Sequence, residues 1–310
     1  MRYGFGVDIG GTTIKIGLFS VDGDLMEKWE IPTNKTDNGK YIFTEIADFI
    51  NRTIETKGIE KSDVMGVGLG VPGPVNKNGF VSVCVNLGWN SLNVEKEFNE
   101  ISGLPVKVGN DANVAALGEM WQGAGKGYQD VLMVTLGTGV GGGCVLNGQI
   151  VSGIHGAGGE IGHMPVKDDE PIACNCGNHG CLEQYVSATG IVNQAKKVLD
   201  LDDRVSSLRN YSSLEAKNIY DEAKNGDVIA NEIVDSTCKI LAKALAQVCS
   251  VIDPEIIVIG GGVSKAGDIL TSRITQSFKK YVFNACASTP IVLAKLENDA
   301  GMYGCVKSLF

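Results

Sequence analysis

The sequence has no excess of basic residues and no long apolar run. Its 310 residues include 27 Lys and Arg against 36 Asp and Glu, which gives a formal net charge of −9. Proteins that bind DNA or RNA usually gather Lys and Arg on one basic face, so this balance argues against a nucleic-acid partner. The chain opens with no basic segment followed by an apolar stretch, and no run of about eighteen apolar residues occurs in it. We therefore expect a soluble, cytoplasmic protein with no membrane partner.

Two familiar phosphate-binding strings are also missing. The string Gly-x-x-x-x-Gly-Lys-Ser/Thr does not occur, so the chain is not a P-loop protein. The glycine-rich stretch 137–142 lacks both the spacing of a dinucleotide-binding turn and the acidic residue expected in such a βαβ unit. Neither motif therefore accounts for the glycine clusters of this chain.

Cysteine is concentrated in one short region. Cys174, Cys176 and Cys181 lie with His163 and His179 within about twenty residues. Cysteine and histidine bind Zn²⁺ tetrahedrally, and a closed shell of these ligands is typical of a structural zinc site. Both histidines are candidates for the fourth ligand. We favour His163, because His179 lies in the short loop between two of the cysteines, where it cannot easily turn inward.

A zinc ion bound there would pin a loop and hold Glu160 and Glu183, which flank the ligands, in fixed positions. The remaining cysteines stand apart in mostly apolar contexts. We expect these six to be buried free thiols: Cys84, Cys144, Cys238, Cys249, Cys286 and Cys305.

Hydrophobic periodicity predicts strands that alternate with helices. Strands are expected at 3–7, 14–19, 25–31, 64–71, 106–108, 131–136, 141–146 and 256–259, and helices at 41–56, 111–121, 228–252, 265–281 and about 300–309. This alternation indicates an α/β fold, and the length of the chain indicates two domains. A strand, glycine turn and strand open the chain and recur at 131–146, which indicates an internal repeat.

Three glycine-rich turns follow predicted strands. The first contains Gly10-Gly11-Thr12-Thr13, the second Gly137-Thr138-Gly139, and the third Gly260-Gly261-Gly262. Glycines let backbone N–H groups approach a phosphate, threonine hydroxyls add donors, and Asp8 beside the first turn can hold a hydrated Mg²⁺. The alternative for the first turn is a tight hairpin without a ligand. The glycine content of the second turn favours a close ligand or backbone approach.

Asn110-Asp111 follows a strand and opens a helix. The simplest interpretation is a helix N-cap, for which Asp is a favoured residue. A carboxylate at the end of a strand is also well placed to act as a base, and phosphoryl transfer needs one near the acceptor hydroxyl. The residue types leave both interpretations open.

Taken in order, these motifs resemble those of the ROK sugar kinases, zinc-containing members of the actin-like ATPase superfamily. The resemblance rests on Asp8-x-Gly-Gly-Thr12, Gly70-Val-Pro-Gly-Pro74, Asn110-Asp111, Leu136-Gly-Thr-Gly-Val-Gly-Gly-Gly143, Glu160-x-Gly-His163, Cys174-x-Cys176-Gly-x-x-Gly-Cys181-x-Glu183 and Gly260-Gly-Gly262. It implies two actin-like (ribonuclease H-like) ATPase domains with an interlobe cleft. The smaller would span 1–115 with a C-terminal helix at about 297–310, and the larger, with the zinc loop, 116–296.

The resemblance also implies roles for individual residues. Asp111 would be the catalytic base, and the sugar would contact Gly73, Asn86, Asn110, Asp111, Glu160, His163 and Glu183. ATP phosphates and Mg²⁺ would be held by Asp8, Gly10, Gly11, Thr12, Thr13, Lys15, Gly137, Thr138, Gly139, Gly261 and Gly262. A structural Zn²⁺ would be bound by His163, Cys174, Cys176 and Cys181, with the second ring nitrogen of His163 on the sugar.

The implied reaction is transfer of the ATP γ-phosphoryl group to the 6-hydroxyl of a hexose, and the family usually forms homodimers. The stretch from Cys181-Leu182-Glu183 into Ser187-Ala188-Thr189-Gly190 looks most like the glucokinases, so glucose is the expected sugar. The alternatives within the family are N-acetylglucosamine or N-acetylmannosamine kinases. A sugar-responsive regulator and a filament-forming actin-like ATPase are further rivals. The acidic charge and the hairpin near residue 3 argue against the first, and the metal cluster argues against the second.

Overall fold

The computed structural model describes residues 2–310, which divide into two compact units. Of the described residues, unit 1 comprises 2–129, 143–159 and 295–310, and unit 2 comprises 130–142 and 160–294. These bounds differ from the predicted division at 115, because residue 115 lies inside a continuous helix that packs wholly within unit 1. The C-terminal helix belongs to unit 1.

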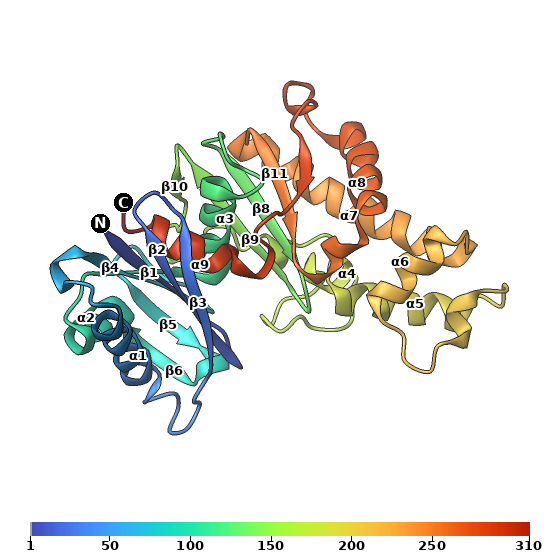
Figure 1. Ribbon diagram of the computed structural model, residues 1–310. Coiled ribbons are helices and arrows are strands. Elements are labelled where there is room, and N and C mark those ends of the chain that lie inside the picture. Colours follow the sequence, from blue (N-terminus) through green and yellow to red (C-terminus); the bar gives the residue numbers. More distant parts are fainter. Residues whose placement is uncertain (1) are drawn as a thin grey trace. The chain divides into compact units, whose positions relative to one another are not determined.

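Unit 1 is built on a five-stranded sheet of order β3-β2-β1-β4-β7 (Figure 1). β1 and β2 are antiparallel, as are β2 and β3, whereas β1, β4 and β7 run parallel. The strands are β1 Tyr3–Ile9, β2 Thr13–Ser20, β3 Leu25–Pro32, β4 Val64–Val71 and β7 Val106–Asn110. A separate ribbon pairs β5 Phe80–Cys84 with β6 Trp89–Asn93, and the helices are α1 Ile42–Lys57, α2 Val94–Ser102, α3 Asp111–Gln122 and α9 Ala300–Lys307.

The two faces of this sheet differ because the residues of β1 alternate. Phe5, Val7 and Ile9 point into an apolar core that includes α1 and α2. On the opposite face, α9 lies so close that a Cβ at Gly6 would sit 2.1 Å from the carbonyl oxygen of Met302, and one at Gly68 of β4 1.8 Å from that of Cys305. The glycines of these strands therefore admit the backbone of α9 directly onto the sheet.

The second sheet has the order β10-β9-β8-β11-β12. Its strands are β8 Val131–Leu136, β9 Val140–Leu146, β10 Gln149–Ile150, β11 Ile256–Gly260 and β12 Ile291–Leu293. β8, β11 and β12 are parallel and belong to unit 2, while the end of β9 pairs with β10 in unit 1. The helices of unit 2 are α4 Glu183–Val186, α5 Ala188–Leu201, α6 Ala216–Lys224, α7 Val228–Ile252 and α8 Asp268–Tyr281.

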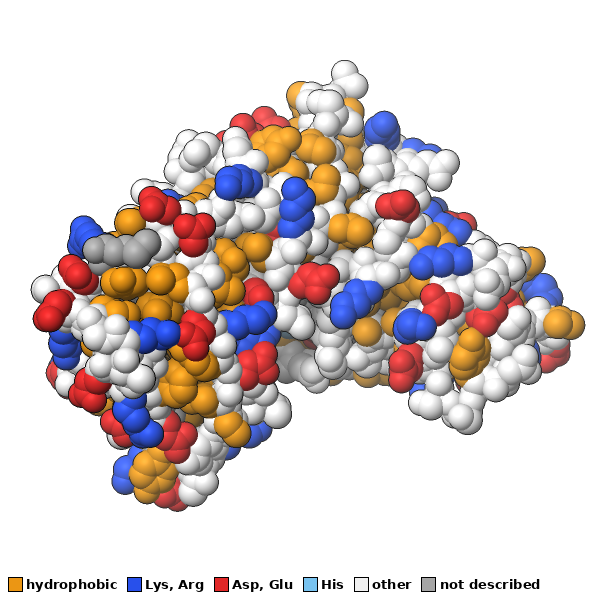
Figure 2. Space-filling view, viewed as in Figure 1, with side chains coloured by type: hydrophobic (Ala, Val, Ile, Leu, Met, Phe, Trp, Pro, Cys, Tyr) orange, Lys and Arg blue, Asp and Glu red, His pale blue; other side chains and the backbone are white. Residues whose placement is uncertain are grey.

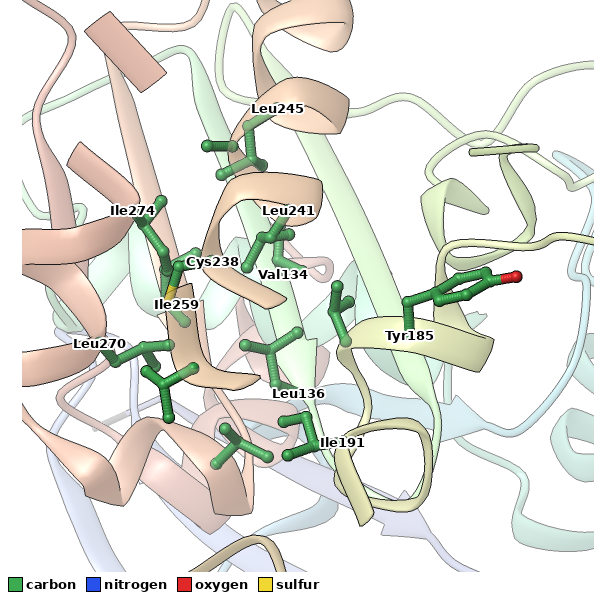
Figure 3. Close-up of a cluster of buried hydrophobic side chains, with 14 of the residues drawn as sticks. Val134, Leu136, Tyr185, Ile191, Cys238, Leu241, Leu245, Ile259, Leu270 and Ile274 are labelled. Atoms are coloured by element: carbon green, nitrogen blue, oxygen red, sulfur yellow. The ribbon is translucent and has the colours of Figure 1, made fainter. Parts of the chain in front are cut away.

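The core of unit 2 lies between its parallel strands and these helices. Figure 3 shows Leu241 and Leu245 of α7 facing Val134 of β8, with Ile274 of α8 beside Ile259 of β11. Val134, Ile259 and Leu241 have no exposed surface. Burial on both faces explains why β8 and β11 are continuous apolar runs rather than alternating ones.

The two sheets share one strand order, which confirms the internal repeat predicted from the sequence. In the first sheet, the antiparallel strands β1 and β2 are followed in the chain by β4 and β7, which run parallel to β1. In the second sheet, β8 and β9 are followed by β11 and β12, which run parallel to β8. One predicted helix, 265–281, is wrong at its start. Residues Gly262–Ala266 form a 3₁₀ turn, and Gly267, with φ +77°, separates it from α8.

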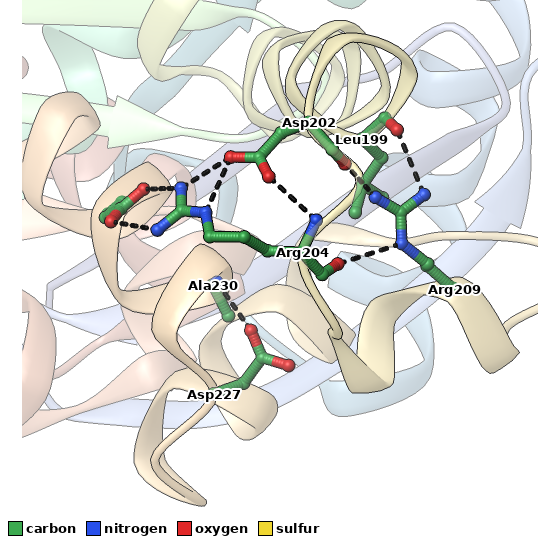
Figure 4. A network of polar contacts seen from close by, with 7 residues as sticks. Leu199, Asp202, Arg204, Arg209, Asp227 and Ala230 are labelled. Atoms are coloured by element: carbon green, nitrogen blue, oxygen red, sulfur yellow. Dashed lines mark hydrogen bonds and ion pairs between the residues drawn. The ribbon is translucent and has the colours of Figure 1, made fainter.

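The surface is charged and mixed in sign. On the face drawn in Figure 2, Lys and Arg side chains are scattered among Asp and Glu rather than gathered into one basic area. In unit 2, Arg204 pairs with Asp202 and with Glu232 of α7 (Figure 4). Such exposed pairs each contribute little to stability. Within residues 2–310, no helix is long and apolar enough to cross a membrane. All six cysteines outside the metal cluster are buried free thiols, as predicted.

Candidate functional site

In unit 1, polar residues gather where the three parallel strands end. β1 ends beside Asp8, β4 leads into Pro72-Gly73-Pro74, and β7 leads into Asn110 and Asp111. Asp8 pairs in register with Gly70, and Val71 with Asn110, so these ends share one edge of the sheet. Ligands in α/β proteins bind at the carboxyl ends of parallel strands. Most of the residues predicted for this part of the site therefore lie together.

Asn110 connects this edge to α3. Its side-chain oxygen accepts hydrogen bonds from the N–H groups of Ala112 (3.0 Å) and Asn113 (3.1 Å), and its amide nitrogen donates to the carbonyl of Gly73 (3.1 Å). The N-cap of α3 is therefore Asn110, not Asp111, which corrects the N-cap interpretation of Asp111. Because Asn110 supplies the cap, the carboxylate of Asp111 remains available for other chemistry.

Asp111 is the first residue of α3 and is exposed at the surface of unit 1. The surrounding protein partly desolvates its carboxylate, and this raises its pKa above the usual value, while hydrogen bonds from the backbone of Ala112 and from Asn110 oppose the rise. One carboxylate oxygen lies 2.8 Å from the Ala112 nitrogen. An accessible carboxylate with a raised pKa suits a proton acceptor.

Asp8 is the second carboxylate of this edge. Burial raises its pKa to about 6, Lys15 opposite it in the β1–β2 ladder lowers that pKa, and Asp111 raises it. A Cβ at Gly301 of α9 would lie 2.9 Å from Asp8, so the carboxylate fits against a glycine surface. A half-buried, desolvated carboxylate with one lysine nearby is suited to a cation that would restore its charged form. The Lys15 ammonium also donates to the carbonyl of Asn298 (2.8 Å).

The first glycine turn closes this edge. The N–H of Gly10 donates to the carbonyl of Thr13 (3.0 Å), and the Thr33 hydroxyl donates to the carbonyl of Gly10 (2.6 Å). The side chain of Thr12 is exposed at the tip. A Cβ at Gly11 would meet only Asn86, at 3.7 Å, so the predicted sugar contact Asn86 lies beside this turn.

In unit 2, the other two glycine turns meet at the ends of β8 and β11. The two strands are parallel, and a Cβ at Gly261 would lie 2.5 Å from the carbonyl of Leu136, the residue before the second turn. Gly137 and Gly262 face open space, since a Cβ on either would contact nothing closer than 4.0 Å. The start of α5 holds the second turn, because the Thr189 hydroxyl donates to the carbonyl of Thr138 (3.0 Å).

A cavity of about 600 Å³ opens next to these turns within unit 2. Its walls come from α5, α6 and the turn at Gly262, and they are mainly apolar with a few charged groups. The lining residues are Ala188, Thr189, Val192, Asn193, Lys196, Leu214, Glu215, Ala216, Lys217, Tyr220, Asp221, Gly262, Val263, Lys265 and Ala266. Of these residues, sequence reasoning proposed only Gly262 as a nucleotide contact, because most of the others lie on α5, on α6 or in the 3₁₀ turn after Gly262, where no phosphate-binding motif marks them.

The metal-ligand candidates also lie in unit 2. The donor atoms of His163, Cys174, Cys176 and Cys181 all lie within 4.8 Å of one another. Nδ1 of His163 is 3.7 Å from Sγ of Cys174, and its Nε2 is 4.0 Å from Glu160. His179 lies outside this group, with its Nδ1 2.9 Å from the carbonyl oxygen of Glu170. Three sulfur donors and one imidazole nitrogen fit a closed tetrahedral Zn²⁺ site.

Glu183 links this cluster to the second glycine turn. One carboxylate oxygen is 3.6 Å from Sγ of Cys174, and the other accepts a hydrogen bond from the N–H of Val140 (3.0 Å). A Cβ at Gly139 would lie 2.1 Å from that second oxygen. Position 139 must therefore be glycine, because a side chain there would clash with Glu183. Sequence reasoning did not identify this local packing constraint.

The chain is similar to proteins of known family. The sequence profile of the ROK family matches residues 4–308. Glucokinase of Halalkalibacterium halodurans is 44% identical, over 98% of this chain and 93% of that protein, and glucokinase of Thermotoga maritima is 37% identical, over 96% and 94%. A solved structure is also similar: the crystal structure of a ROK family glucokinase from Streptomyces griseus in complex with glucose and AMPPNP. The match spans 99% of this chain and 98% of that one, at 31% identity and a TM-score of 0.75.

Proposed function

The chain belongs to the ROK family, and from this premise we propose that it is an ATP-dependent glucokinase. It would transfer the γ-phosphoryl group of Mg-ATP to the 6-hydroxyl of glucose. The observation that carries the proposal is the exposed carboxylate of Asp111, released from capping by Asn110 and placed at the strand ends beside Asp8 and Gly73. A phosphoryl acceptor needs such a proton acceptor close to its hydroxyl.

In this proposal the acceptor contacts come from two sets of residues. Gly73, Asn86, Asn110 and Asp111 of unit 1 would contact the sugar, as would Glu160, His163 and Glu183 of unit 2. The raised pKa of Asp111 makes its carboxylate a better proton acceptor than an ordinary aspartate. Because the transition state of phosphoryl transfer is loose, the position of Asp111 matters more than its basicity.

The nucleotide would occupy unit 2. Adenosine fits the largely apolar cavity between α5 and α6, and the phosphates would reach the N–H groups of Gly137, Thr138, Gly139, Gly261 and Gly262. On unit 1, Asp8, Gly10, Gly11, Thr12, Thr13 and Lys15 offer a carboxylate, hydroxyls, backbone N–H groups and an ammonium. Mg²⁺ bound to the phosphates would neutralise their charge, and Asp8 is the carboxylate suited to hold it.

Zn²⁺ would have a structural role. Bound by His163, Cys174, Cys176 and Cys181, it would fix the ring of His163 with Nδ1 toward the metal and Nε2 toward Glu160. The contact between Glu183 and Cys174 ties the same loop to the second glycine turn. The metal would thus order residues of the sugar site and of the phosphate site together. We also propose that the protein acts as a homodimer, as the family usually does.

The test is an assay of ADP release with Mg-ATP against glucose, mannose, fructose, allose, N-acetylglucosamine and N-acetylmannosamine. We expect turnover with glucose to exceed that with every other sugar. A preference for an N-acetyl sugar would retain the mechanism but reject glucose as the substrate. No turnover with any sugar would reject the kinase.

A further inference from the structure

Glu119, in the third turn of α3, carries a carboxylate with no exposed surface. Three backbone N–H groups donate to its two oxygens: Ala124 (2.7 Å), Lys295 (3.0 and 3.1 Å) and Leu296 (2.7 Å). Burying a carboxylate costs free energy unless hydrogen bonds compensate for the lost water. The side chain is therefore committed to holding these two backbone segments.

One of the two segments lies where the chain passes from unit 2 into unit 1. Ala294 is the last residue of unit 2, and its N–H donates to the carbonyl of Ile259 in β11 (2.9 Å). Lys295 is the first residue of the final segment of unit 1, and its N–H donates to Glu119. Two adjacent N–H groups are thus bound by different units, and Glu119 fixes the unit 1 side of this crossing.

The other segment leads to the crossing between Gln129 and Asp130. Besides holding Ala124 with its side chain, Glu119 accepts hydrogen bonds at its own carbonyl from the N–H groups of Gly123 (3.0 Å) and Gly125 (2.9 Å). A Cβ at Gly123 would lie 2.0 Å from the Glu119 carboxylate, so the turn closes tightly on this side chain. The chain passes from one unit to the other at four crossings. Glu119 therefore contacts the segments that lead to two of them.

The same residue is rigidly connected to Asp111. Both belong to α3, eight residues apart, which at 1.5 Å per residue is about 12 Å. α3 is itself fixed against α9, because a Cβ at Gly118 would lie 2.1 Å from the carbonyl of Ala300. A displacement of either crossing relative to Glu119 is thus a displacement relative to the helix that begins with Asp111.

We propose that Glu119 is a positioning residue for phosphoryl transfer, which sets the two crossings at a fixed place relative to the Asp111 helix. The inference rests on the proposed function, in which Asp111 of unit 1 must meet a phosphoryl group bound to unit 2. Alignment of reacting groups accounts for a large part of catalysis, and a misplacement of about 1 Å can cost about 10²-fold in rate. Each unit keeps its own binding residues when Glu119 is altered, so turnover should suffer more than binding.

The test variant is Glu119→Gln, which keeps the shape of the side chain. Each carboxylate oxygen accepts hydrogen bonds from two backbone N–H groups. In glutamine an NH₂ group replaces one of these oxygens, and because NH₂ is itself a donor it cannot accept the hydrogen bonds on that side. We expect kcat to fall by at least about 10-fold, while the KM values for ATP and glucose change by less than about 3-fold. Ile46→Ala, in the buried core of α1, is the control for a general loss of stability in unit 1.

A fall in kcat no greater than in the Ile46→Ala control, or an equal loss of ATP and glucose binding, would overturn the inference. If Glu119→Gln does not fold, Glu119→Asp serves instead. It keeps the charge but is one methylene shorter, so it cannot reach Ala124, Lys295 and Leu296 together, and we expect the same selective fall in kcat.

Hydrogen exchange separates failure of this inference from failure of the proposed function. In Glu119→Gln, the amides of Ala124, Lys295 and Leu296 should exchange faster, while those of β8 and β11 stay protected. Unchanged exchange at the three amides would overturn the anchoring role. A wild-type protein that phosphorylates no hexose would reject the proposed function, and the exchange result would still decide whether Glu119 holds the crossings.

Discussion

Replacing Asp8 with asparagine should stabilise the fold and abolish its activity. Burial raises the pKa of Asp8 from 3.8 to about 6, so the folded state favours the protonated form. The favourable contribution of the protonated form is fully present below pH 3.8 and is lost as the pH rises through about 6. Above that pH the charged carboxylate destabilises the protein, and asparagine, which stays neutral, removes this cost.

The size of the effect follows from the shift. With the pKa raised from 3.8 to about 6, ionisation of Asp8 lowers the free energy of unfolding by about 3 kcal/mol at pH 7.5 and by about 1 kcal/mol at pH 4.5, relative to strongly acidic pH. The gain from Asp8→Asn should therefore be greater at pH 7.5 than at pH 4.5 by about 2 kcal/mol. For a unit of this size, that is a difference of about 4–8 °C in the midpoint of thermal unfolding.

The assay is calorimetric unfolding of both proteins at pH 4.5 and 7.5 without added divalent cations, together with kcat at pH 7.5. We expect the variant to be more stable because it lacks the desolvated charge, and inactive because, in the proposed function, this carboxylate holds the cation. An equal change in unfolding midpoint at the two pH values would refute the electrostatic reasoning. Normal kcat in the variant would refute the role of Asp8 in the site.

Three further results are expected. Asp111→Asn should lower kcat by about 10²- to 10⁴-fold without lowering the unfolding midpoint, and near wild-type turnover would contradict its role as base. Cys176→Ser should lose bound zinc, measured by elemental analysis, and weaken glucose binding in titration calorimetry, whereas unchanged binding in a zinc-free protein would reject the structural role. Gly304→Ala should destabilise unit 1 by about 1–3 kcal/mol in urea unfolding, because its Cβ would lie 1.6 Å from the Val114 carbonyl, and wild-type stability would disprove that contact.

Strand and turn placement was largely predictable from the sequence. The apolar run at 64–71 and the amphipathic stretch at 228–252 coincide with β4 and α7, because period and flanking residues both agree with the final structure. The boundary of the helix predicted at 265–281 failed, since nothing in the local pattern shows that Gly267 adopts φ +77°. The predicted domain boundary at residue 115 also differs from the division into units, because α3 packs against α9 and so joins segments that are far apart in the sequence.

The candidate site was predictable only where residue types carry chemistry. The three cysteines could be singled out because thiols and a histidine at this spacing have few other uses, whereas the residue types alone left Asp111 open between a helix cap and a base. The residue types could not show whether Asn110 or Asp111 caps α3, and only the structure identifies Asn110 as the cap. Residues such as Tyr220 and Val192, which line the cavity of unit 2, are indistinguishable in sequence from ordinary core positions.

The central claim is best tested by identifying the product directly. The protein is incubated with Mg-ATP and glucose, and the phosphorus spectrum of the mixture is recorded with correlation to sugar protons. We expect ADP and an equal amount of glucose phosphorylated on its 6-oxygen, with almost none formed by Asp111→Asn. ADP with free phosphate, a phosphate on another oxygen, or unchanged ATP would contradict the account.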